Sequence, residues 1–451
     1  MSQEKEFTLP GNARTADDSL GQATVNSGRR RLLGALGAGA AIAAVQGAAF
    51  AAVRKPKSIG RVVIIGAGFG GATAAKYLRK WSNGSIDVTL IERNKQFISC
   101  PTSNEVLGGN RAYESLVHGY DKLGKNWGVK LVNASATAVD AEKRRVRTDT
   151  AGEFEYDRLI VAPGFDFNFA SIEGYDEKAR ERILHAWKAG AQTLALRQQL
   201  VDLPDGGVYA LTIPKAPYRC PPGPYERASQ IAWYFKQNKP KSKVLVLDAN
   251  DKIISKEKLF LGVWEKDYAG IIEYTPKWNA TGVDAASNTV ISELGDRLHA
   301  DVLNLLPAQR AGDIARAIGI VNVNDRWADI DWITLESTAL KNVHVVGDAL
   351  SAAPLMPKSG HMANQHGKAV AAAIVEIFSG REPQPTLLAN TCYSLVDDKR
   401  AIHVDSVHRY DPEKKQPLVV AGSGGVSSAP SVEEGLYTRA WAETIWKDVL
   451  A

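Results

Sequence analysis

The sequence predicts an α/β fold with two Rossmann-like dinucleotide-binding domains and a C-terminal α+β domain. Two strand–helix–strand patterns, one from residue 61 and one from residue 207, predict the two nucleotide-type units. A third strand, which ends in Gly347-Asp348, indicates that the chain returns to the first unit. With 451 residues, the chain is long enough for two or three domains with a sizeable core.

The first nucleotide site is predicted at residues 61–92. An apolar, β-branched run at Val62–Ile65 is typical of a buried parallel strand, and a second strand ends in Glu92. The turn between strand and helix carries three glycines in the pattern G-x-G-x-x-G: Gly66, Gly68 and Gly71. These glycines permit a tight turn, the approach of a pyrophosphate to the backbone, and close packing of helix on strand. Glu92 is placed to accept both hydroxyls of an adenosine ribose, so the site should bind FAD or NAD rather than NADP.

Charge and cysteine content exclude several classes of function. The net charge of +5 is small for this length, so no nucleic-acid partner is expected. No two of the three cysteines, Cys100, Cys220 and Cys392, are close enough for a zinc knuckle, and no C-x-x-C-H motif for covalent haem is present. No metal site is therefore predicted in this chain.

Residues 1–51 are predicted to be a twin-arginine signal peptide. Arg29-Arg30-Arg31 precede two leucines and a short run rich in alanine and glycine, and Ala49-Phe50-Ala51 offers a cleavage site. This pathway exports folded, cofactor-loaded proteins, so the mature chain is expected in a bacterial periplasm. An uncleaved anchor is the alternative, but the apolar run is short for a span. No later stretch is long and apolar enough to cross a bilayer, so no stable membrane insertion is expected.

Two further segments match those with which the chain returns to the FAD-binding site in proteins of the glutathione-reductase class. A strand at residues 156–161 leads into the small-residue turn Ala162-Pro163-Gly164, about a hundred residues after the first glycine. Farther along, Gly347-Asp348 ends another strand, and the aspartate is expected to accept hydrogen bonds from ribityl hydroxyls. The helix that begins near Lys358 should point its positive N-terminal end at the flavin ring.

The second nucleotide-type unit carries an unusual turn. After the strand at residues 207–213, four prolines fall between residues 217 and 224. Proline fixes φ and lacks a donor N–H, so this turn cannot wrap a pyrophosphate with backbone amides. The unit is therefore predicted to have lost NAD binding, with the Cys220 thiol on that side of the flavin instead. Helices are expected at His185–Leu200 and Arg227–Phe235.

Some residues leave several interpretations open. Cys100 lies in a loop beyond the second strand, where it could be a buried apolar filler, a redox thiol or an attachment point for the flavin 8α-methyl group. His361 and His366 could act as bases, although such histidines are more often packing residues. The helical stretch Val432–Leu450 is expected to pack on the core.

The predicted domain boundaries follow from these segments. After the signal peptide, the parts are 58–170 and 313–384 for the FAD-binding domain, 171–312 for the degenerate second Rossmann-like domain, and 385–451 for a C-terminal interface domain.

Together the motifs resemble the flavoprotein subunit of flavocytochrome c sulfide dehydrogenase over nearly the whole mature chain. The segments that carry the resemblance are the Cys100 loop with Ser103–Val106, the turn Cys220–Arg227, residues 301–312, Gly347-Asp348, and Thr391-Cys392-Tyr393. The resemblance implies that Cys100 carries FAD through an 8α-S-cysteinyl bond. It also implies that Cys220 and Cys392 form a redox-active disulfide beside the ring, with Glu226 as a proton acceptor.

A c-type cytochrome partner is implied as well, with haem c on that separate subunit of a heterodimer. In the expected reaction, hydrosulfide attacks one sulfur of the Cys220–Cys392 pair, and the released thiolate reduces the flavin. Haem then accepts the electrons singly, and sulfur or polysulfide is the product. Arg219 and Arg227, which flank Cys220 in sequence, are expected to lower the pKa of its thiol. The expected enzyme is a sulfide–cytochrome c reductase.

Three alternatives compete with this interpretation. A sulfide:quinone oxidoreductase-like enzyme would use the same thiol chemistry but reduce a quinone at a membrane. A non-catalytic flavoprotein that binds a sulfur carrier would keep the fold without reacting with sulfide. An NADH-dependent disulfide reductase is disfavoured by the proline-rich turn.

Overall fold

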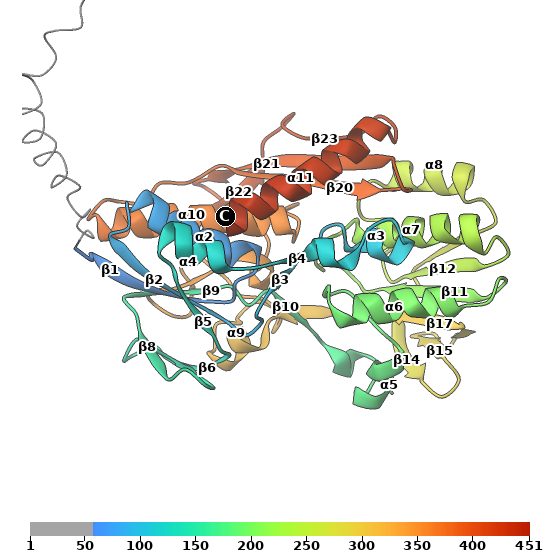
Figure 1. Cartoon of the computed structure of the whole chain (residues 1–451), viewed down its shortest axis with the longest axis horizontal. Coiled ribbons are helices and arrows are strands. Elements are labelled where there is room, and N and C mark those ends of the chain that lie inside the picture. The colour runs from blue at the N-terminus through green and yellow to red at the C-terminus, as the bar shows by residue number, and fades with distance from the viewer. Residues whose placement is uncertain (1–56) are drawn as a thin grey trace, which may run out of the picture. The chain divides into compact units, whose positions relative to one another are not determined.

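A parallel five-stranded sheet in the order β19-β9-β1-β2-β5 forms the first nucleotide-binding unit (Figure 1). The computed structural model describes residues 57–451, so the predicted signal peptide lies outside the described residues. The strands are β1 (Gly60–Ile65), β2 (Ile86–Glu92), β5 (Lys130–Asn133), β9 (Arg158–Val161) and β19 (Val343–Val345). β19 pairs with β9 only after the chain has passed through the second sheet. This unit is therefore built from two separated parts of the chain.

Two helices from these separate parts pack closely against each other beside the first sheet. They are α2 (Phe69–Trp81) and α10 (Gly360–Phe378), and both are rich in alanine. A Cβ atom added at Gly367 of α10 would lie 2.5 Å from the carbonyl oxygen of Gly70 in α2. Glycine is required at this crossing because only a residue without a side chain lets the two backbones approach so closely.

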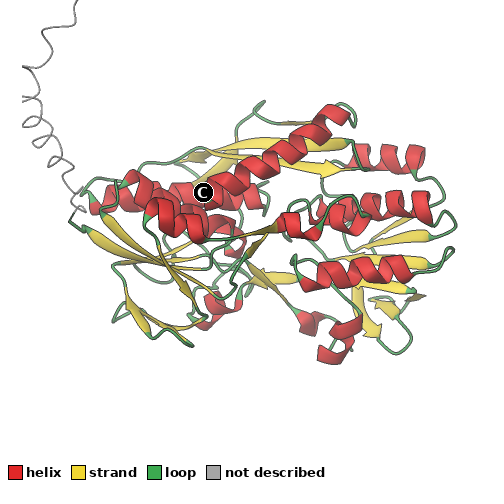
Figure 2. Ribbon diagram, viewed as in Figure 1, coloured by secondary structure: helices red, strands yellow, loops and turns green. Residues whose placement is uncertain are grey.

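A parallel four-stranded sheet in the order β13-β12-β11-β17 forms the second unit, with helices α6 and α7 beside it (Figure 2). Its strands are β11 (Val208–Ile213), β12 (Lys243–Asp248), β13 (Ile272–Pro276) and β17 (Val302–Leu305). Its helices are α6 (Ala191–Asp202), α7 (Gly223–Asn238) and α8 (Glu257–Asp267).

The bounds predicted for two helices of this unit are wrong. The helix expected from His185 begins only at Ala191, because the preceding residues form a loop that bridges Leu184 to Asn304 of β17. The helix expected from Arg227 begins four residues earlier, at Gly223, with Pro224 in its first turn. Proline is well suited to this place, because the first N–H groups of a helix have no partner within it.

Small sheets and short helices connect and flank the two units. The strands are β3 (Phe97–Ile98), β4 (Val117–His118), β6 (Ala136–Asp140), β7 (Arg145–Thr148), β8 (Glu153–Glu155), β10 (Phe165–Phe167), β14 (Ala280–Asp284), β15 (Thr289–Ser292), β16 (Arg297–His299) and β18 (Gln309–Ala311). The helices are α3 (Ser103–Gly108), α4 (Asp121–Trp127), α5 (Glu177–Arg182) and α9 (Asp313–Ala317), with 3₁₀ turns at Tyr113–Leu116, Phe169–Ser171 and Gly347–Ala349.

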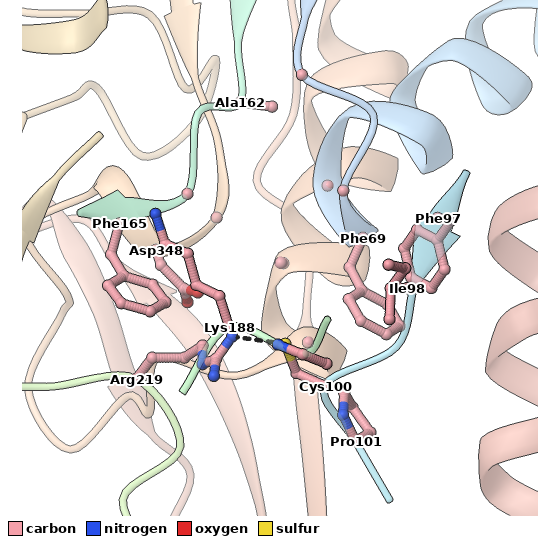
Figure 3. Close-up of a pocket in the computed structure, with 18 of the residues that line it drawn as sticks. Phe69, Phe97, Ile98, Cys100, Pro101, Ala162, Phe165, Lys188, Arg219 and Asp348 are labelled. Carbon is pink, nitrogen blue, oxygen red and sulfur yellow. Dashed lines mark hydrogen bonds between the residues drawn. The ribbon is translucent and has the colours of Figure 1, made fainter. Parts of the chain in front are cut away.

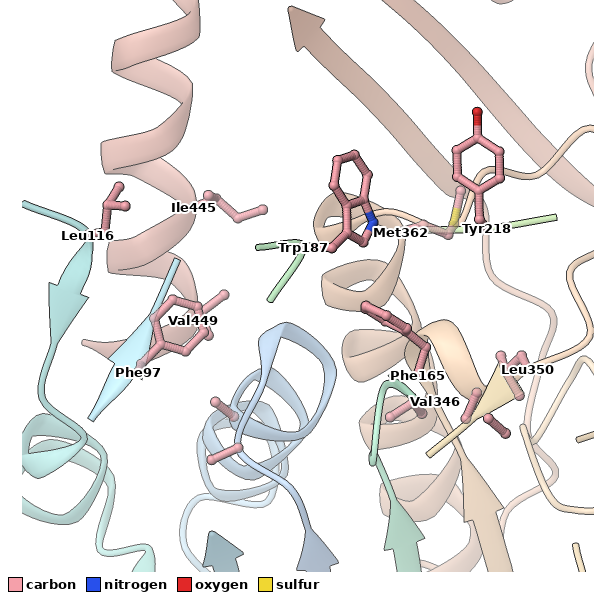
Figure 4. Packing of buried hydrophobic residues seen from close by; sticks show 14 of the residues in the cluster. Phe97, Leu116, Phe165, Trp187, Tyr218, Val346, Leu350, Met362, Ile445 and Val449 are labelled. Carbon is pink, nitrogen blue, oxygen red and sulfur yellow. The ribbon is translucent and has the colours of Figure 1, made fainter. Parts of the chain in front are cut away.

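An antiparallel sheet and a long helix form the C-terminal part. The strands are β20 (Leu388–Leu395), β21 (Ala401–Asp411), β22 (Gln416–Val419) and β23 (Gly425–Val426), and the helix is α11 (Val432–Leu450). Ile445 and Val449 of α11 are buried in the core cluster that also holds Phe97 and Leu116 (Figure 4). Among the helices of residues 57–451, none combines the length and the apolarity that a bilayer span needs.

Candidate functional site

One cavity of about 530 Å³ brings together segments from all three parts of the chain. Eleven of the twelve residues singled out from the sequence line it: Gly66, Gly68, Glu92, Cys100, Ala162, Gly164, Cys220, Glu226, Gly347, Asp348 and Cys392. The twelfth, Gly71, lies behind the glycine-rich turn, where an added Cβ atom would be 1.9 Å from the carbonyl oxygen of Gly66. Its place matches the helix packing that the sequence pattern predicts for the third glycine.

The glycine-rich turn leaves room for a phosphate at one end of the cavity. A Cβ atom at Gly68 would meet no other atom within 4 Å on the cavity side, and no side chain caps the N-terminus of α2 that follows. The carboxylate of Glu92 is held at the end of β2 by the backbone N–H groups of Ala67 (2.7 Å) and Asn94 (2.8 Å). Open N–H groups beside a fixed carboxylate suit the pyrophosphate and ribose of a dinucleotide.

Asp348 supplies a direct test of whether a flavin nucleotide fits. Its Oδ1 is buried and has no hydrogen-bond partner among the described residues, although Asp348 lines the cavity. Burial raises the pKa of this carboxyl group above its ordinary value, and the charges of Arg219 and Lys358 oppose the shift. A buried acceptor without a donor is costly, so a ligand hydroxyl at this place would remove the penalty. The ribityl chain of FAD carries such hydroxyls.

Two N–H donors converge on the sulfur of Cys100. The Nη1 of Arg219 lies 3.0 Å from Sγ, and the backbone N–H of Ala189 lies 3.4 Å from it. Figure 3 shows Arg219, Phe165 and Asp348 on one side of the cavity, Phe69, Phe97 and Ile98 on the other, and Cys100 between them. The sulfur of Cys100 therefore accepts two hydrogen bonds in the cavity wall, which favours a reactive thiol or an attachment point over an apolar filler.

Cys220 is held in an unusual backbone conformation at the start of α7. Its φ of +59° lies in the left-handed region, which costs about 1–3 kcal/mol for a residue other than glycine. Its N–H donates to the carbonyl of Lys358 (2.7 Å), and its carbonyl accepts from Gly223 (2.8 Å). A Cβ atom at Gly223 would lie 2.7 Å from the Cys220 sulfur, so the thiol occupies the space that a side chain there would take.

Cys392 projects into the same cavity from β20. Its sulfur contacts the side-chain amide of Asn390, at 3.3 Å from Nδ2. All three cysteines are free thiols in this structure, so the disulfide between Cys220 and Cys392 stays a prediction. Burial raises the pKa of the Cys220 thiol to about 12, and the negative charges of Cys392 and Glu226 add to the shift. The charge of Cys392 therefore acts on the Cys220 thiol.

Of the two arginines expected to lower the pKa of the Cys220 thiol, Arg219 acts in that direction, but burial outweighs its charge and raises the pKa. The side chain of Arg219 also hydrogen bonds to the sulfur of Cys100. Arg227 is 2% exposed and donates to Asn104, Asn304 and the carbonyls of His185 and Ala186. Arg227 therefore links α7 to the segments that carry these partners and stabilises the fold.

Glu226 and Lys256 form a buried acid and base beside the two thiols. Burial raises the pKa of Glu226 to about 7, although Leu395 N–H (3.0 Å) and the amide of Asn104 (3.0 Å) donate to its oxygens. Burial lowers the pKa of Lys256 to about 8, and the charges of Cys392, Glu226 and Cys220 oppose the shift. The Nζ of Lys256 donates to the carbonyl of Cys392 (3.0 Å) and to Ser394 (2.8 Å). Perturbed pKa values of this kind cluster at functional sites.

The two histidines of α10 lie in different surroundings. His361 lines the cavity, and its Nδ1 accepts a hydrogen bond from Thr391 (3.0 Å). His366 lies outside the large cavity under Gly347, and burial lowers its pKa to about 3. Only His361 is therefore placed to meet a ligand in the cavity.

The acidic residue at the corresponding position of the second nucleotide-type unit, Asp248, is not accessible to a ligand. Asp248 ends β12 as Glu92 ends β2, but it is fully buried. One oxygen accepts from the hydroxyls of Tyr225 (2.7 Å) and Tyr274 (3.0 Å), and the other from the N–H (2.9 Å) and side-chain amide (2.7 Å) of Asn250. A carboxylate accepts about four hydrogen bonds, so Asp248 has no capacity left for a ribose.

Comparison with known protein families places three matches along the chain. Residues 193–307 match the central domain of the sulfide dehydrogenase [flavocytochrome c] flavoprotein chain, and residues 383–450 match the flavin-binding domain of flavocytochrome c sulphide dehydrogenase. Residues 60–202 match the pyridine nucleotide-disulphide oxidoreductase family. The first two matches include Cys220, Glu226 and Cys392, and the third includes Cys100.

Similar proteins of known sequence cover a shorter stretch. The type II NADH:quinone oxidoreductase of Staphylococcus haemolyticus is 32% identical over 120 residues, and that of Staphylococcus saprophyticus is 31% identical over 120 residues. Each match covers 26% of this chain and only 30% of the relative's length.

Solved structures confirm the fold predicted from the sequence. The sulfide:quinone oxidoreductase of Aquifex aeolicus superposes with a TM-score of 0.70 at 19% identity, over 86% of this chain and 91% of that one. The putidaredoxin reductase in a covalent complex with putidaredoxin has a TM-score of 0.62 at 18% identity, over 87% and 94% of the two chains. The glutathione-reductase-like architecture is therefore established, whereas identities this low carry no activity across.

Proposed function

Since the chain belongs to the family of flavocytochrome c sulfide dehydrogenase flavoproteins, we propose that it oxidises sulfide with a Cys220–Cys392 pair beside bound FAD. Electrons leave to a separate c-type cytochrome subunit. The observation that carries this proposal is the shared cavity: two cysteines 172 positions apart in sequence line the same space as the nucleotide-binding glycines and Asp348. A buried carboxyl group, Glu226, and a buried amine, Lys256, accompany the cysteines.

The thiols carry the first part of the reaction. With the pair oxidised, hydrosulfide forms a bond to one cysteine sulfur, and the other leaves as a thiolate. Glu226 accepts the proton of the bound hydrosulfide, because a carboxyl group with a pKa of about 7 exchanges protons readily at neutral pH. Lys256 places a positive charge beside the thiolate that leaves, which stabilises it. The bound FAD supplies a two-electron acceptor that can release electrons one at a time.

Three finer features belong to the same proposal. FAD is attached through Cys100, whose sulfur lies in the wall of the nucleotide cavity. Haem c is carried by the cytochrome partner, because this sequence has no C-x-x-C-H motif of its own. The reaction takes place in the periplasm, to which the twin-arginine motif at Arg29-Arg30 directs the chain.

The test is anaerobic addition of sulfide to the purified chain. We expect the flavin absorbance to bleach and added cytochrome c to be reduced. Cys220→Ser and Cys392→Ser should each keep bound flavin but bleach at least about a hundredfold more slowly, because each removes an atom of the reacting pair. Turnover at the wild-type rate in either variant would reject the thiol mechanism.

The choice of electron acceptor is tested in the same experiment. Parallel samples receive cytochrome c or a water-soluble quinone after the flavin has been reduced by sulfide. Reoxidation by cytochrome c alone supports the cytochrome partner. Reoxidation by quinone alone supports the alternative of a sulfide:quinone oxidoreductase-like enzyme, and absence of bleaching supports a non-catalytic flavoprotein.

A further inference from the structure

The three cysteines of the cavity differ in the groups that face their sulfur atoms. Cys100 receives a guanidinium N–H from Arg219 at 3.0 Å and a backbone N–H from Ala189 at 3.4 Å. The sulfur of Cys392 hydrogen bonds to neutral side chains, those of Asn390 and Ser359. Hydrogen bonds from a cation to a sulfur stabilise the thiolate, which is the nucleophilic form. The arrangement around Cys100 therefore favours reaction at that sulfur.

Several contacts hold the guanidinium of Arg219 toward the sulfur of Cys100. Its Nη2 donates to the carbonyl of Trp187, and its own carbonyl accepts from the Trp187 indole N–H (3.3 Å). The guanidinium lies 4.8 Å from the ring centre of Phe165. The backbone N–H of Arg219 donates to the side-chain oxygen of Gln309 (2.9 Å). Burial acts to lower the pKa of Arg219, but the charges of Cys100, Asp348 and Cys220 raise it above its ordinary value. The side chain thus remains a cation beside Cys100.

Two other cations of the cavity wall are already engaged with other partners. The amine of Lys188 forms an ion pair with Asp166. The guanidinium of Arg227 donates to Asn104, Asn304 and the carbonyls of His185 and Ala186. The hydrogen bond to the sulfur of Cys100 comes from the guanidinium of Arg219.

We propose that Arg219, together with the N–H of Ala189, activates Cys100 for its own covalent attachment to the flavin, so that the chain needs no separate attaching enzyme. This inference rests on the proposed FAD site and on the proposed link through Cys100. It assigns to Arg219 a catalytic role in cofactor attachment, distinct from the sulfide chemistry at Cys220 and Cys392.

The attachment step balances without an external oxidant. The lone pair of the Cys100 thiolate forms the S–C bond to the 8α carbon. That carbon loses one proton, and the electron pair of its C–H bond enters the ring system, which is thereby reduced by two electrons. Dioxygen or the cytochrome acceptor then reoxidises the attached cofactor before the first turnover with sulfide.

The first experiment measures attachment in the full-length chain purified from riboflavin-depleted cells, so that Cys100 is free at the start. Wild type, Arg219→Gln and Arg219→Lys are incubated with excess FAD, samples are precipitated with acid, and covalent flavin is read as fluorescence on a denaturing gel. We expect Arg219→Gln to attach flavin about tenfold to a hundredfold more slowly, because a charge-assisted hydrogen bond is lost. Guanidinium ions added to the Arg219→Ala variant should restore part of the rate. The matched control is Arg310→Gln, since Arg310 pairs with Asp313 and does not line the cavity.

The second experiment does not depend on FAD. Alkylation of Cys100 by iodoacetamide is followed by mass spectrometry in wild-type and variant chains produced in riboflavin-depleted cells, in which Cys100 carries no flavin. Arg219→Gln should slow the alkylation by a similar factor. Covalent attachment at the wild-type rate in Arg219→Gln, or unchanged alkylation, overturns the inference while the link itself stands. Acid-soluble flavin from the wild type would instead reject the proposed link, and with it the step that Arg219 is assigned to catalyse.

Discussion

At the scale of single residues, a buried acid that lines the cavity and a buried base behind Cys392 have pKa values that burial moves toward neutrality. Glu226 and Lys256 are each less than 10% exposed, and each is hydrogen bonded to the strand that carries Cys392. Both groups are therefore able to change charge close to neutral pH, which ordinary surface glutamates and lysines do not do. This property can be measured without any substrate.

Glu226 should make the stability of the chain depend on pH. Burial raises its pKa from 4.5 to about 7, so the folded chain holds this proton more tightly than the unfolded chain. The stabilisation is complete below pH 4.5 and is lost as the pH rises through 7. We expect the free energy of unfolding of wild type to fall by up to about 3 kcal/mol relative to Glu226→Gln between pH 5 and pH 8. Urea unfolding of both chains at equal flavin content measures this difference, and parallel pH curves would contradict it.

Local sequence signals indicate the motif residues of the cavity, but not the direction of its side chains. The glycine-rich turn, Gly347-Asp348 and the three cysteines are visible in the sequence as motifs. Lys256 is not indicated, because it precedes α8 in an ordinary polar stretch and meets Cys392 only through the fold. The hydrogen bond from Arg219 to Cys100 is not indicated either, because adjacency to Cys220 in sequence does not decide where a guanidinium points.

At the scale of elements, the contact between α2 and α10 fixes the position of the cavity. Ser359 caps α10 by accepting from Met362 (3.0 Å), and the residues after it line the cavity. On the other side of the contact, α2 begins directly after the glycine-rich turn. A shift between these two helices would therefore displace both ends of the nucleotide site.

Gly367→Ala should destabilise the chain through this contact. The added Cβ atom would lie 2.5 Å from the carbonyl oxygen of Gly70 and 2.8 Å from Thr73, so the helices must separate, at a cost of about 1–3 kcal/mol. The matched control is Gly262→Ala in α8, where a Cβ atom meets nothing within 4 Å. Because alanine favours a helix more than glycine does, this control should stabilise by about 1 kcal/mol. Thermal unfolding of the two variants measures both effects, and an equal sign for both would refute the argument.

Element types were predictable where periodicity was strong, and their bounds were not. The α11 range was predicted correctly, since its cap and its apolar pattern are local. The start of α7 was missed because prolines were assigned to the turn, whereas Pro224 is accepted in the first helical turn. The loop before α6 depends on its pairing with β17, which no local pattern indicates.

At the scale of the whole molecule, one nucleotide site is open and the other is closed. The first sheet presents its glycine-rich turn and Glu92 to the cavity. In the second sheet the corresponding acid is Asp248, and both of its carboxylate oxygens already accept hydrogen bonds from Tyr225, Tyr274 and Asn250. The proline-rich turn predicts the loss of NAD binding, and the hydrogen bonds of the tyrosines and Asn250 to Asp248 are a second reason to expect it.

NADH should therefore fail to reduce the bound flavin. We expect bleaching by NADH at less than about one hundredth of the rate found with sulfide, because neither phosphate nor ribose finds its usual partners. Stopped-flow absorbance of the same anaerobic sample with each donor makes the comparison, and sulfide serves as the control that the flavin is accessible. Comparable rates would mean that a nicotinamide site exists elsewhere in the chain.

The late return of β19 to the first sheet has a consequence for biosynthesis. A nascent polypeptide that has left the ribosome only as far as residue 340 has neither this strand nor Asp348, and Cys392 is still to be translated. The cavity is therefore complete only after residue 392 of 451 has left the ribosome. This order of assembly agrees with the proposed export of the chain as a finished, cofactor-loaded molecule.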